Sequence, residues 1–249
     1  MSDRAIRVIV WDENPGHASK EIYPRSLRGA IGDGIRELGG SKVEVLEAHL
    51  DEPSQGITDD RLSGADVLLW WGHARHGEVK DEVAALVKKH VHENGLGFIP
   101  LHSGHYSKTF RQVLGAPGHL RGGWREEPET EPEEITVCAP KHPIAEGISD
   151  FVLPVEEMYG APFDAPPSQV VVFQSYFPAG GEYFPSFALT VGKGIDPAFT
   201  SGHGHGQNQG EGVGRVFYFR PGHETYPTYH DKNVRKVIWN AVKWAAKRS

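Results

Sequence analysis

Residues 97–105 have the sequence Gly-Phe-Ile-Pro-Leu-His-Ser-Gly-His, and this stretch decides how the surrounding chain folds. A short apolar run ends in small and imidazole-bearing residues, and a polar segment of helical character, residues 107–114, follows directly. This order predicts a strand, a tight turn and a helix. Ligands of open α/β sheets bind at the carboxyl ends of strands, beside the free N–H groups of the next helix. We therefore expect His102, Ser103 and His105 to lie in a cleft.

The segments on either side predict an α/β sheet built around this unit. Apolar runs predict buried strands, and apolar residues at helical spacing predict helices. The first strand, helix and second strand form a right-handed βαβ unit. The expected strands are residues 5–11, 43–49, 66–71, 135–139 and 214–219, and the expected helices are residues 22–38, 80–91 and 231–247. The β-rich segments 170–174 and 187–191 either extend the sheet or form an antiparallel flap.

The predicted fold class is therefore a three-layer α/β/α domain with a mostly parallel central sheet, of the flavodoxin-like kind. At 249 residues the chain can bury a sizeable core, and we expect a single domain over residues 1–249. Long loops are predicted at 116–134 and 192–214, and the acidic run from Glu126 to Glu134 within the first is expected to be solvated. The Gly- and His-rich stretch 201–210 is either a disordered surface loop or a lid that carries His203 and His205.

The composition excludes several classes of partner. A formal charge of −7 and a pI near 6.0 give no reason to expect nucleic acid or an anionic membrane as a partner. The glycine-rich loop lacks the context of a P-loop or a G-x-G-x-x-G motif, so no nucleotide cofactor is expected. One Cys excludes an internal disulfide framework, and no apolar run resembles a signal peptide or a membrane span. We expect a cytoplasmic protein that binds a small neutral molecule, and the sequence leaves open whether it forms a homo-oligomer.

The sequence contains 14 histidines, and many of them are not scattered but follow predicted strands. His90 and His92 lie in a polar helix pattern and are expected to face solvent, while His49, His119 and His142 show no clustering. The others mostly follow predicted strands: His17, His73, His76, His102, His105, His203, His205, His223 and His230. Because the carboxyl ends of parallel strands meet at one sheet edge, these imidazoles predict a ligand site there.

Residues 101–105 also resemble the G-x-C-x-G-[HQ] elbow of class I glutamine amidotransferases, with His102 where the catalytic Cys would stand. Imidazole cannot form the glutamyl thioester, and neither Ser103 nor the single Cys138 stands in the vacant position, so we do not expect an active glutamine amidotransferase. A His at this place is similar to the ThuA-like (trehalose-utilisation) family. That resemblance implies the amidotransferase fold without its catalytic triad.

Further motifs carry the same resemblance. Residues 70–77, Trp-Trp-Gly-His-Ala-Arg-His-Gly, and residues 214–223, Gly-Arg-Val-Phe-Tyr followed by Gly-His, both resemble ThuA-like segments. So do the acidic-Glu-x-Tyr segment ending at Tyr159 and the His-Pro-Ile-x-x-Gly turn at residues 142–147. Pro and Gly explain that turn by architecture alone, so His142 is not a candidate site residue.

The resemblance implies a part in the metabolism of trehalose, related disaccharides or their keto derivatives, and hence a small-molecule sugar as ligand. The candidate catalytic residues are His102, His223 and Glu157. The candidate substrate-binding residues are Asn14, His17, His73, His76, Ser103, His105, Tyr159 and Glu224. A sugar ring could also find an apolar face on Trp11, Trp70, Trp71 or Tyr159.

Two interpretations of the histidine cluster stay open. His102 and His223, with one of His17, His73, His76 or Glu224, could bind zinc or another divalent metal, because catalytic zinc usually takes three such ligands. The same imidazoles could instead form a network of hydrogen bonds to sugar hydroxyls. The first hypothesis is an enzyme that acts on a sugar or ketoglycoside; the alternative is a non-catalytic sugar-binding or regulatory protein on an amidotransferase scaffold.

Overall fold

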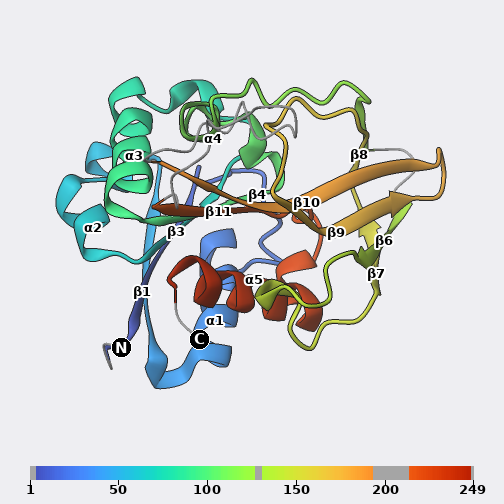
Figure 1. Cartoon of the computed structure of the whole chain (residues 1–249), viewed down its shortest axis with the longest axis horizontal. Coiled ribbons are helices and arrows are strands. Elements are labelled where there is room, and N and C mark those ends of the chain that lie inside the picture. Colours follow the sequence, from blue (N-terminus) through green and yellow to red (C-terminus); the bar gives the residue numbers. More distant parts are fainter. Residues whose placement is uncertain (1–3, 127–130, 193–212, 248–249) are drawn as a thin grey trace, which may run out of the picture.

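A computed structural model describes residues 4–126, 131–192 and 213–247 of the chain, which form a three-layer α/β/α arrangement (Figure 1). Within these residues, nine strands form one sheet. Their order is β2 (Val43–His49), β1 (Ile6–Asp12), β3 (Val67–Trp71), β4 (Gly97–Leu101), β11 (Gly214–Tyr218), β10 (Glu182–Val191), β9 (Val170–Phe177), β6 (Glu131–Val137) and β7 (Phe151–Glu156).

The sheet has a parallel half and an antiparallel half. The first five strands in that order pair in parallel, from β2 to β11. The remaining strands, from β10 to β7, pair antiparallel and widen the sheet on the side of β11. The predicted fold class is confirmed, and the segments at 170–174 and 187–191 extend the sheet as parts of β9 and β10. A second, two-stranded sheet joins β5 (Trp124–Arg125) to β8 (Met158–Tyr159).

Helices cover both faces of the parallel half (Figure 1). One face carries α1 (Leu27–Gly39) and α5 (Lys232–Ala245), and the other carries α2 (Asp59–Gly64), α3 (Asp81–Asn94) and α4 (Lys108–Leu114). All residues of β3 and β4 are buried, because helices shield both sides of these central strands. No helix among the described residues is both long and apolar enough to cross a membrane.

Capping explains where two helices begin. The helix predicted over residues 22–38 begins only at Leu27, because the Ser26 hydroxyl accepts a hydrogen bond from the Gly29 backbone N–H and acts as the N-cap. The helix predicted over residues 107–114 begins at Lys108, because Ser107 is its N-cap. These capping side chains satisfy backbone donors that the first turn leaves free.

The structure corrects the predictions for the acidic run and for His90. The loop expected at 116–134 contains β5 and the start of β6, and both Glu131 and Glu133 are buried rather than solvated. They are buried because β6 pairs with β7 and β9, which turns its alternate side chains inward. His90 is also buried, with its Nε2 atom 3.0 Å from the Asp59 carboxylate, because its side of α3 packs toward α2. Most of the loop predicted at 192–214, including the lid hypothesis for His203 and His205, lies outside the described residues.

Candidate active site

Several of the predicted site residues follow strands of the parallel half. His73 follows β3, His102 follows β4, and His223 and Glu224 follow β11. Their strands are neighbours in the sheet and run parallel, so their carboxyl ends open on the same edge. The side chains therefore converge from three separate loops, although they lie far apart in the sequence.

His102 has the backbone conformation of a nucleophile elbow. Its φ angle is +50°, which a residue with a Cβ rarely adopts. Its backbone N–H donates to the carbonyl of Phe219 at 2.9 Å, and its own carbonyl accepts from the Tyr218 hydroxyl at 3.0 Å. A Cβ on Gly104 would lie 2.9 Å from the Trp70 carbonyl oxygen, so the turn also requires glycine there. Strained backbone held in this way is found at functional sites, where it presents a side chain to a ligand.

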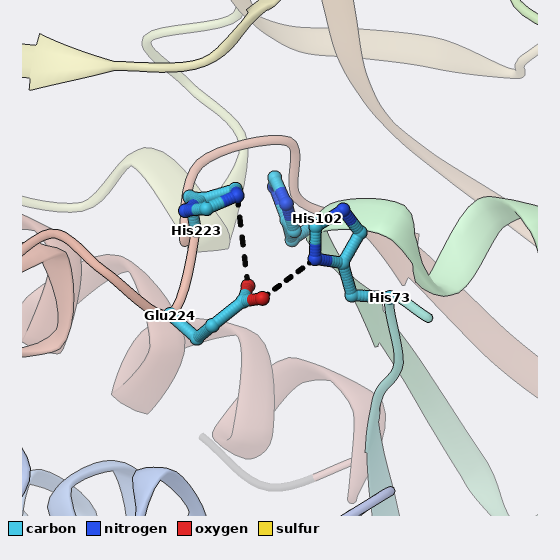
Figure 2. Close-up of side chains that lie close together, drawn as sticks. All are labelled: His73, His102, His223 and Glu224. Carbon is cyan, nitrogen blue, oxygen red and sulfur yellow. Dashed lines mark hydrogen bonds and ion pairs between the residues drawn. The ribbon is translucent and has the colours of Figure 1, made fainter. Parts of the chain in front are cut away.

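His73, His102, His223 and Glu224 form a compact group, which we call the histidine cluster (Figure 2). Each residue offers one ligand atom, and these four atoms all lie within 4.8 Å of one another. The His73 Nδ1 atom lies 2.7 Å from Glu224 Oε1, and His223 Nε2 lies 3.8 Å from Glu224 Oε2. Nitrogen and carboxylate donors at such spacing are the ligands that zinc and related divalent metals take in proteins.

Burial and mutual attraction set the protonation of the cluster. Burial lowers the pKa of the His102 imidazole well below its usual value, and burial also lowers the pKa of His223 despite the carboxylates around it. For Glu224, burial favours the neutral acid, but the neighbouring histidines outweigh it and lower its pKa to about 2. Burial likewise opposes the charged form of His73, yet its hydrogen bond to Glu224 raises the pKa of the ring. The lowered pKa values of His102, His223 and Glu224 favour neutral imidazoles and an ionised carboxylate, the forms that bind a metal, whereas the raised pKa of His73 means that a metal has to displace a proton there.

Two ligand atoms of the cluster have no hydrogen-bond partner among the described residues. These atoms are His223 Nε2 and Glu224 Oε2, and both are shielded from solvent. A buried polar atom without a partner costs free energy, so such atoms are uncommon in native proteins. Their contacts are ion pairs only: His223 Nε2 lies 3.3 Å from Glu126 Oε1 and 3.8 Å from Glu224 Oε2. Donors without hydrogen bonds, on residues already arranged at metal-binding spacing, fit a divalent cation.

A cavity of about 450 Å³ lies beside the cluster, and its volume is within the range of small-molecule sites. It is lined by His73, His76, Ser103, His105, Tyr106, Leu120, Trp124, Glu126, Glu157 and Tyr159. Glu157 is the carboxylate nearest to His102, with its Oε2 atom 3.2 Å from the imidazole Nε2. Burial raises the pKa of this carboxyl above its usual value. The Tyr159 hydroxyl links Ser103, to which it is hydrogen-bonded, with His102 Nε2 at 3.2 Å.

Other predicted site residues lie around the cluster with different partners. His17 is half exposed, and its Nε2 atom contacts Glu224 Oε1. His76 lines the cavity, and burial lowers the pKa of its ring to about 4. His105 also lines the cavity, but its Nδ1 atom is bonded to the Gly118 carbonyl at 2.8 Å, which gives that atom a structural role.

The structure places two groups of predicted residues elsewhere. Asn14 is exposed, its amide bonded to Asp51 and its carbonyl oxygen to Arg28, and it does not line the cavity. Trp11, Trp70 and Trp71 are fully buried, and the first two stack on each other with ring centroids 3.7 Å apart. Burial in the core explains why these three tryptophans offer no surface to a sugar.

Several residues of the site region escaped prediction. The buried Glu13 carboxylate accepts the backbone N–H groups of Ala74 and Arg75 at 2.6 and 2.9 Å, and so fixes the loop that carries His73. Glu126 lies 3.3 Å from His223 Nε2, and Trp124 lines the cavity two residues earlier. Glu13 directly follows the first strand, which could have indicated it as a sheet-edge residue. Trp124 stands in a Gly- and Arg-rich stretch without such a signal.

Comparisons with known proteins agree with this architecture. A family model named ThuA and described as "Trehalose utilisation" matches residues 7–245. The structure is similar to a glutamine amidotransferase from Thermotoga maritima, with a TM-score of 0.53, 12% identity, and coverage of 98% of this chain and 99% of that chain. It is also similar to the glutaminase domain of Trypanosoma brucei CTPS with bound acivicin, with a TM-score of 0.50, 10% identity, and coverage of 98% and 95%. At these identities the likeness shows the fold alone. No curated protein matches the chain.

Proposed function

The chain belongs to the ThuA family, described as trehalose utilisation, and we propose that it is a metal-dependent enzyme that acts on a sugar or ketoglycoside. The observation that carries the proposal is the histidine cluster, in which four donor atoms lie within 4.8 Å of one another at a sheet edge. His223 Nε2 and Glu224 Oε2 are buried and form ion-pair contacts but no hydrogen bond among the described residues, which favours a bound cation over a closed network of hydrogen bonds.

His73, His102 and His223 would hold the metal, and zinc suits this donor set. Glu224 is suited to two roles. Its Oε2 atom forms no hydrogen bond among the described residues and can ligate the metal, while its Oε1 atom orients His73 through the 2.7 Å contact. A bound divalent ion would supply polarisation of a carbonyl group or activation of a water molecule.

Glu157 is the residue we assign to proton transfer. It lines the cavity, its carboxyl is buried, and its raised pKa brings proton exchange closer to neutral pH. Its Oε2 atom contacts His102 Nε2 at 3.2 Å and forms no hydrogen bond among the described residues, so it can exchange a proton with a sugar hydroxyl or carbonyl in the cavity. Ser103 and Tyr159 line the same wall and offer hydroxyl groups that orient a polyhydroxylated ligand.

The test is a turnover assay on the zinc-loaded protein with trehalose and its keto derivatives, followed by NMR detection of products. Glu157→Gln keeps the size of the side chain and removes its acid–base function, so we expect turnover to fall by about 10²- to 10⁴-fold with metal content unchanged. Glu37→Gln, on the exposed end of α1, is the matched control and should retain full turnover. A protein that binds these sugars but never converts them would contradict the enzyme proposal and favour a sugar-binding protein.

A further inference from the structure

The mouth of the cavity carries an exposed aromatic side chain that the proposed chemistry does not use. Trp124 is 65% exposed, the largest exposed fraction among the large hydrophobic residues that the structure describes as exposed. It nevertheless lines the cavity, together with Leu120 and the 40% exposed Tyr106. An exposed indole at the entrance of a cavity keeps most of its apolar surface in water, so a ligand can cover that surface.

The backbone beneath Trp124 is held firmly in place. In the small sheet Trp124 pairs with Tyr159 and Arg125 pairs with Met158. The Gly160 backbone N–H donates to the Gly123 carbonyl at 2.9 Å, and a Cβ on Gly122 would collide with the Ala161 carbonyl oxygen. The two segments are therefore in close contact through their backbones, and the exposed indole stands on a fixed support.

The pairing also relates Trp124 to the inner part of the site. Residues directly opposite each other in an antiparallel pair point to the same side, so Trp124 and Tyr159 face the same cavity. The Tyr159 hydroxyl reaches His102 and Ser103, and Glu126 lies 3.3 Å from His223 Nε2. The two-stranded sheet of β5 and β8 thus connects the cavity mouth to the histidine cluster.

The chemistry of the lining selects the kind of ligand. None of the described residues that line the cavity is Lys or Arg, while Glu126 and Glu157 supply acceptor oxygens. Arg111 is not among the lining residues; its guanidinium carbon packs 3.8 Å from the centre of the Tyr106 ring, and its Nε and Nη2 atoms are buried without a hydrogen-bond partner among the described residues. Carboxylates repel an anionic group and accept hydrogen bonds from hydroxyls, and an indole face packs against the C–H face of a sugar.

We propose that Trp124 is the platform of an outer subsite that binds the second, uncharged sugar ring of a glycoside, and that it determines the preference for a disaccharide over a single sugar. The inner ring then faces Glu157 and Tyr159 beside the histidine cluster. This inference rests on the proposed function for the identity of the inner site, but the subsite is defined by binding and does not need turnover.

The test measures equilibrium binding of trehalose and of methyl α-glucoside, a single ring, to the zinc-loaded wild type, Trp124→Ala and Trp124→Phe. We expect Trp124→Ala to weaken trehalose binding by about 5- to 10-fold, since a stacked aromatic contact contributes about 1–1.5 kcal/mol. Methyl α-glucoside should change by less than about 2-fold, and Trp124→Phe should recover part of the trehalose affinity. Tyr183→Ala, a 55% exposed aromatic that does not line the cavity, is the control and should bind both sugars normally.

The outcomes separate this inference from the proposed function. Unchanged trehalose affinity in Trp124→Ala, equal losses for both sugars, or a wild type that binds neither sugar would overturn the subsite. Selective loss of trehalose binding without any turnover in the wild type would support the subsite and contradict the enzyme. Because Trp124 is exposed, its substitutions should leave the melting temperature unchanged, which circular dichroism checks.

Discussion

Two groups of buried charged residues lie next to each other in this protein, and their partners differ. Arg220 lies two residues after the end of β11 and forms one group with Glu133 and Glu156, which we call the arginine cluster. Three and four residues later the chain supplies His223 and Glu224 to the histidine cluster. Both groups are buried, but the arginine cluster contains its own fixed cation, Arg220, whereas the histidine cluster holds four donor atoms within 4.8 Å of one another without a Lys or Arg among its members.

Arg220 forms ion pairs with both carboxylates of the arginine cluster. Arg220 Nε donates to Glu133 Oε1 at 2.9 Å, and Arg220 Nη2 lies 3.1 Å from Glu156 Oε2. Arg220 also donates to the Glu157 carbonyl, and Glu156 accepts the Gly222 backbone N–H at 3.1 Å. The arginine cluster therefore joins the segment that carries Glu157 to the loop that carries His223.

Buried charged residues in this protein thus fall into two kinds, those that stabilise the fold and those that can bind a ligand. A buried charge whose partners all come from the protein holds segments together. Several buried nitrogen and carboxylate donors that converge beside a cavity without a fixed cation indicate a site for an ion that the chain does not itself supply.

Removal of Arg220 should destabilise the whole fold. Arg220→Met leaves Glu133 and Glu156 buried without their cation, so the free energy of unfolding should fall by about 3–5 kcal/mol. Arg121→Met removes a surface pair with Asp164 and should cost at most about 1 kcal/mol. Urea denaturation of both variants measures the difference. Equal stability of the two variants would show that the arginine cluster is not a structural support.

Substitution in the histidine cluster should instead affect ligand binding. Glu224→Gln removes the charge that orients His73 and offers Oε2, so zinc affinity should fall by about 10- to 100-fold or more. Competition with a chromophoric chelator measures that affinity, and Glu37→Gln again serves as the control. Unchanged zinc affinity would exclude Glu224 from both roles and leave a site of histidines only.

His105 tests the distinction between stabilising and ligand-binding residues, because it lines the cavity yet is hydrogen-bonded to the Gly118 carbonyl. Burial lowers the pKa of its ring to about 3, so the unfolded chain takes up a proton near pH 6.5 that the folded chain does not. The neutral His105 ring therefore does not reduce the free energy of unfolding above pH 6.5, and it reduces that free energy increasingly as the pH falls from 6.5 toward 3. Lowering the pH from 6.5 to 5.5 should reduce the free energy of unfolding by about 1 kcal/mol through His105. His105→Gln should lack that part of the slope in denaturation curves; an unchanged slope would contradict the assignment.

Much of the parallel half was predictable from the sequence, and the reason is physical. Continuous apolar runs such as β3 and β4 have few alternatives to burial in a sheet with helices on both faces. Parallel strands also bring their carboxyl ends together, so the sequence indicated that His102 and His223 would converge. It left open which further residue joins them, since that choice depends on the paths of the loops.

The arginine cluster and the cavity mouth were not predictable in this way. Glu133 stands in a run of charged residues that is typical of a solvated loop, and only its pairing on β6 buries it against Arg220. Trp124 owes its place to a two-residue pairing with β8, which is too short to leave a pattern in the sequence. Asn14 follows β1 as expected, but Asp51 and Arg28 bind its side chain away from the cavity. Such tertiary contacts carry no local signal.

The central claim is that the histidine cluster binds a divalent metal, and elemental analysis of protein purified without a His tag tests it most directly. Wild type and His142→Ala, which changes a histidine outside the cluster, should each contain about one zinc or similar ion per chain. His102→Ala and His223→Ala should contain almost none while remaining folded by circular dichroism. Absence of metal from the wild type, after incubation with zinc and removal of the excess, would contradict the claim, as would equal metal content in all four proteins.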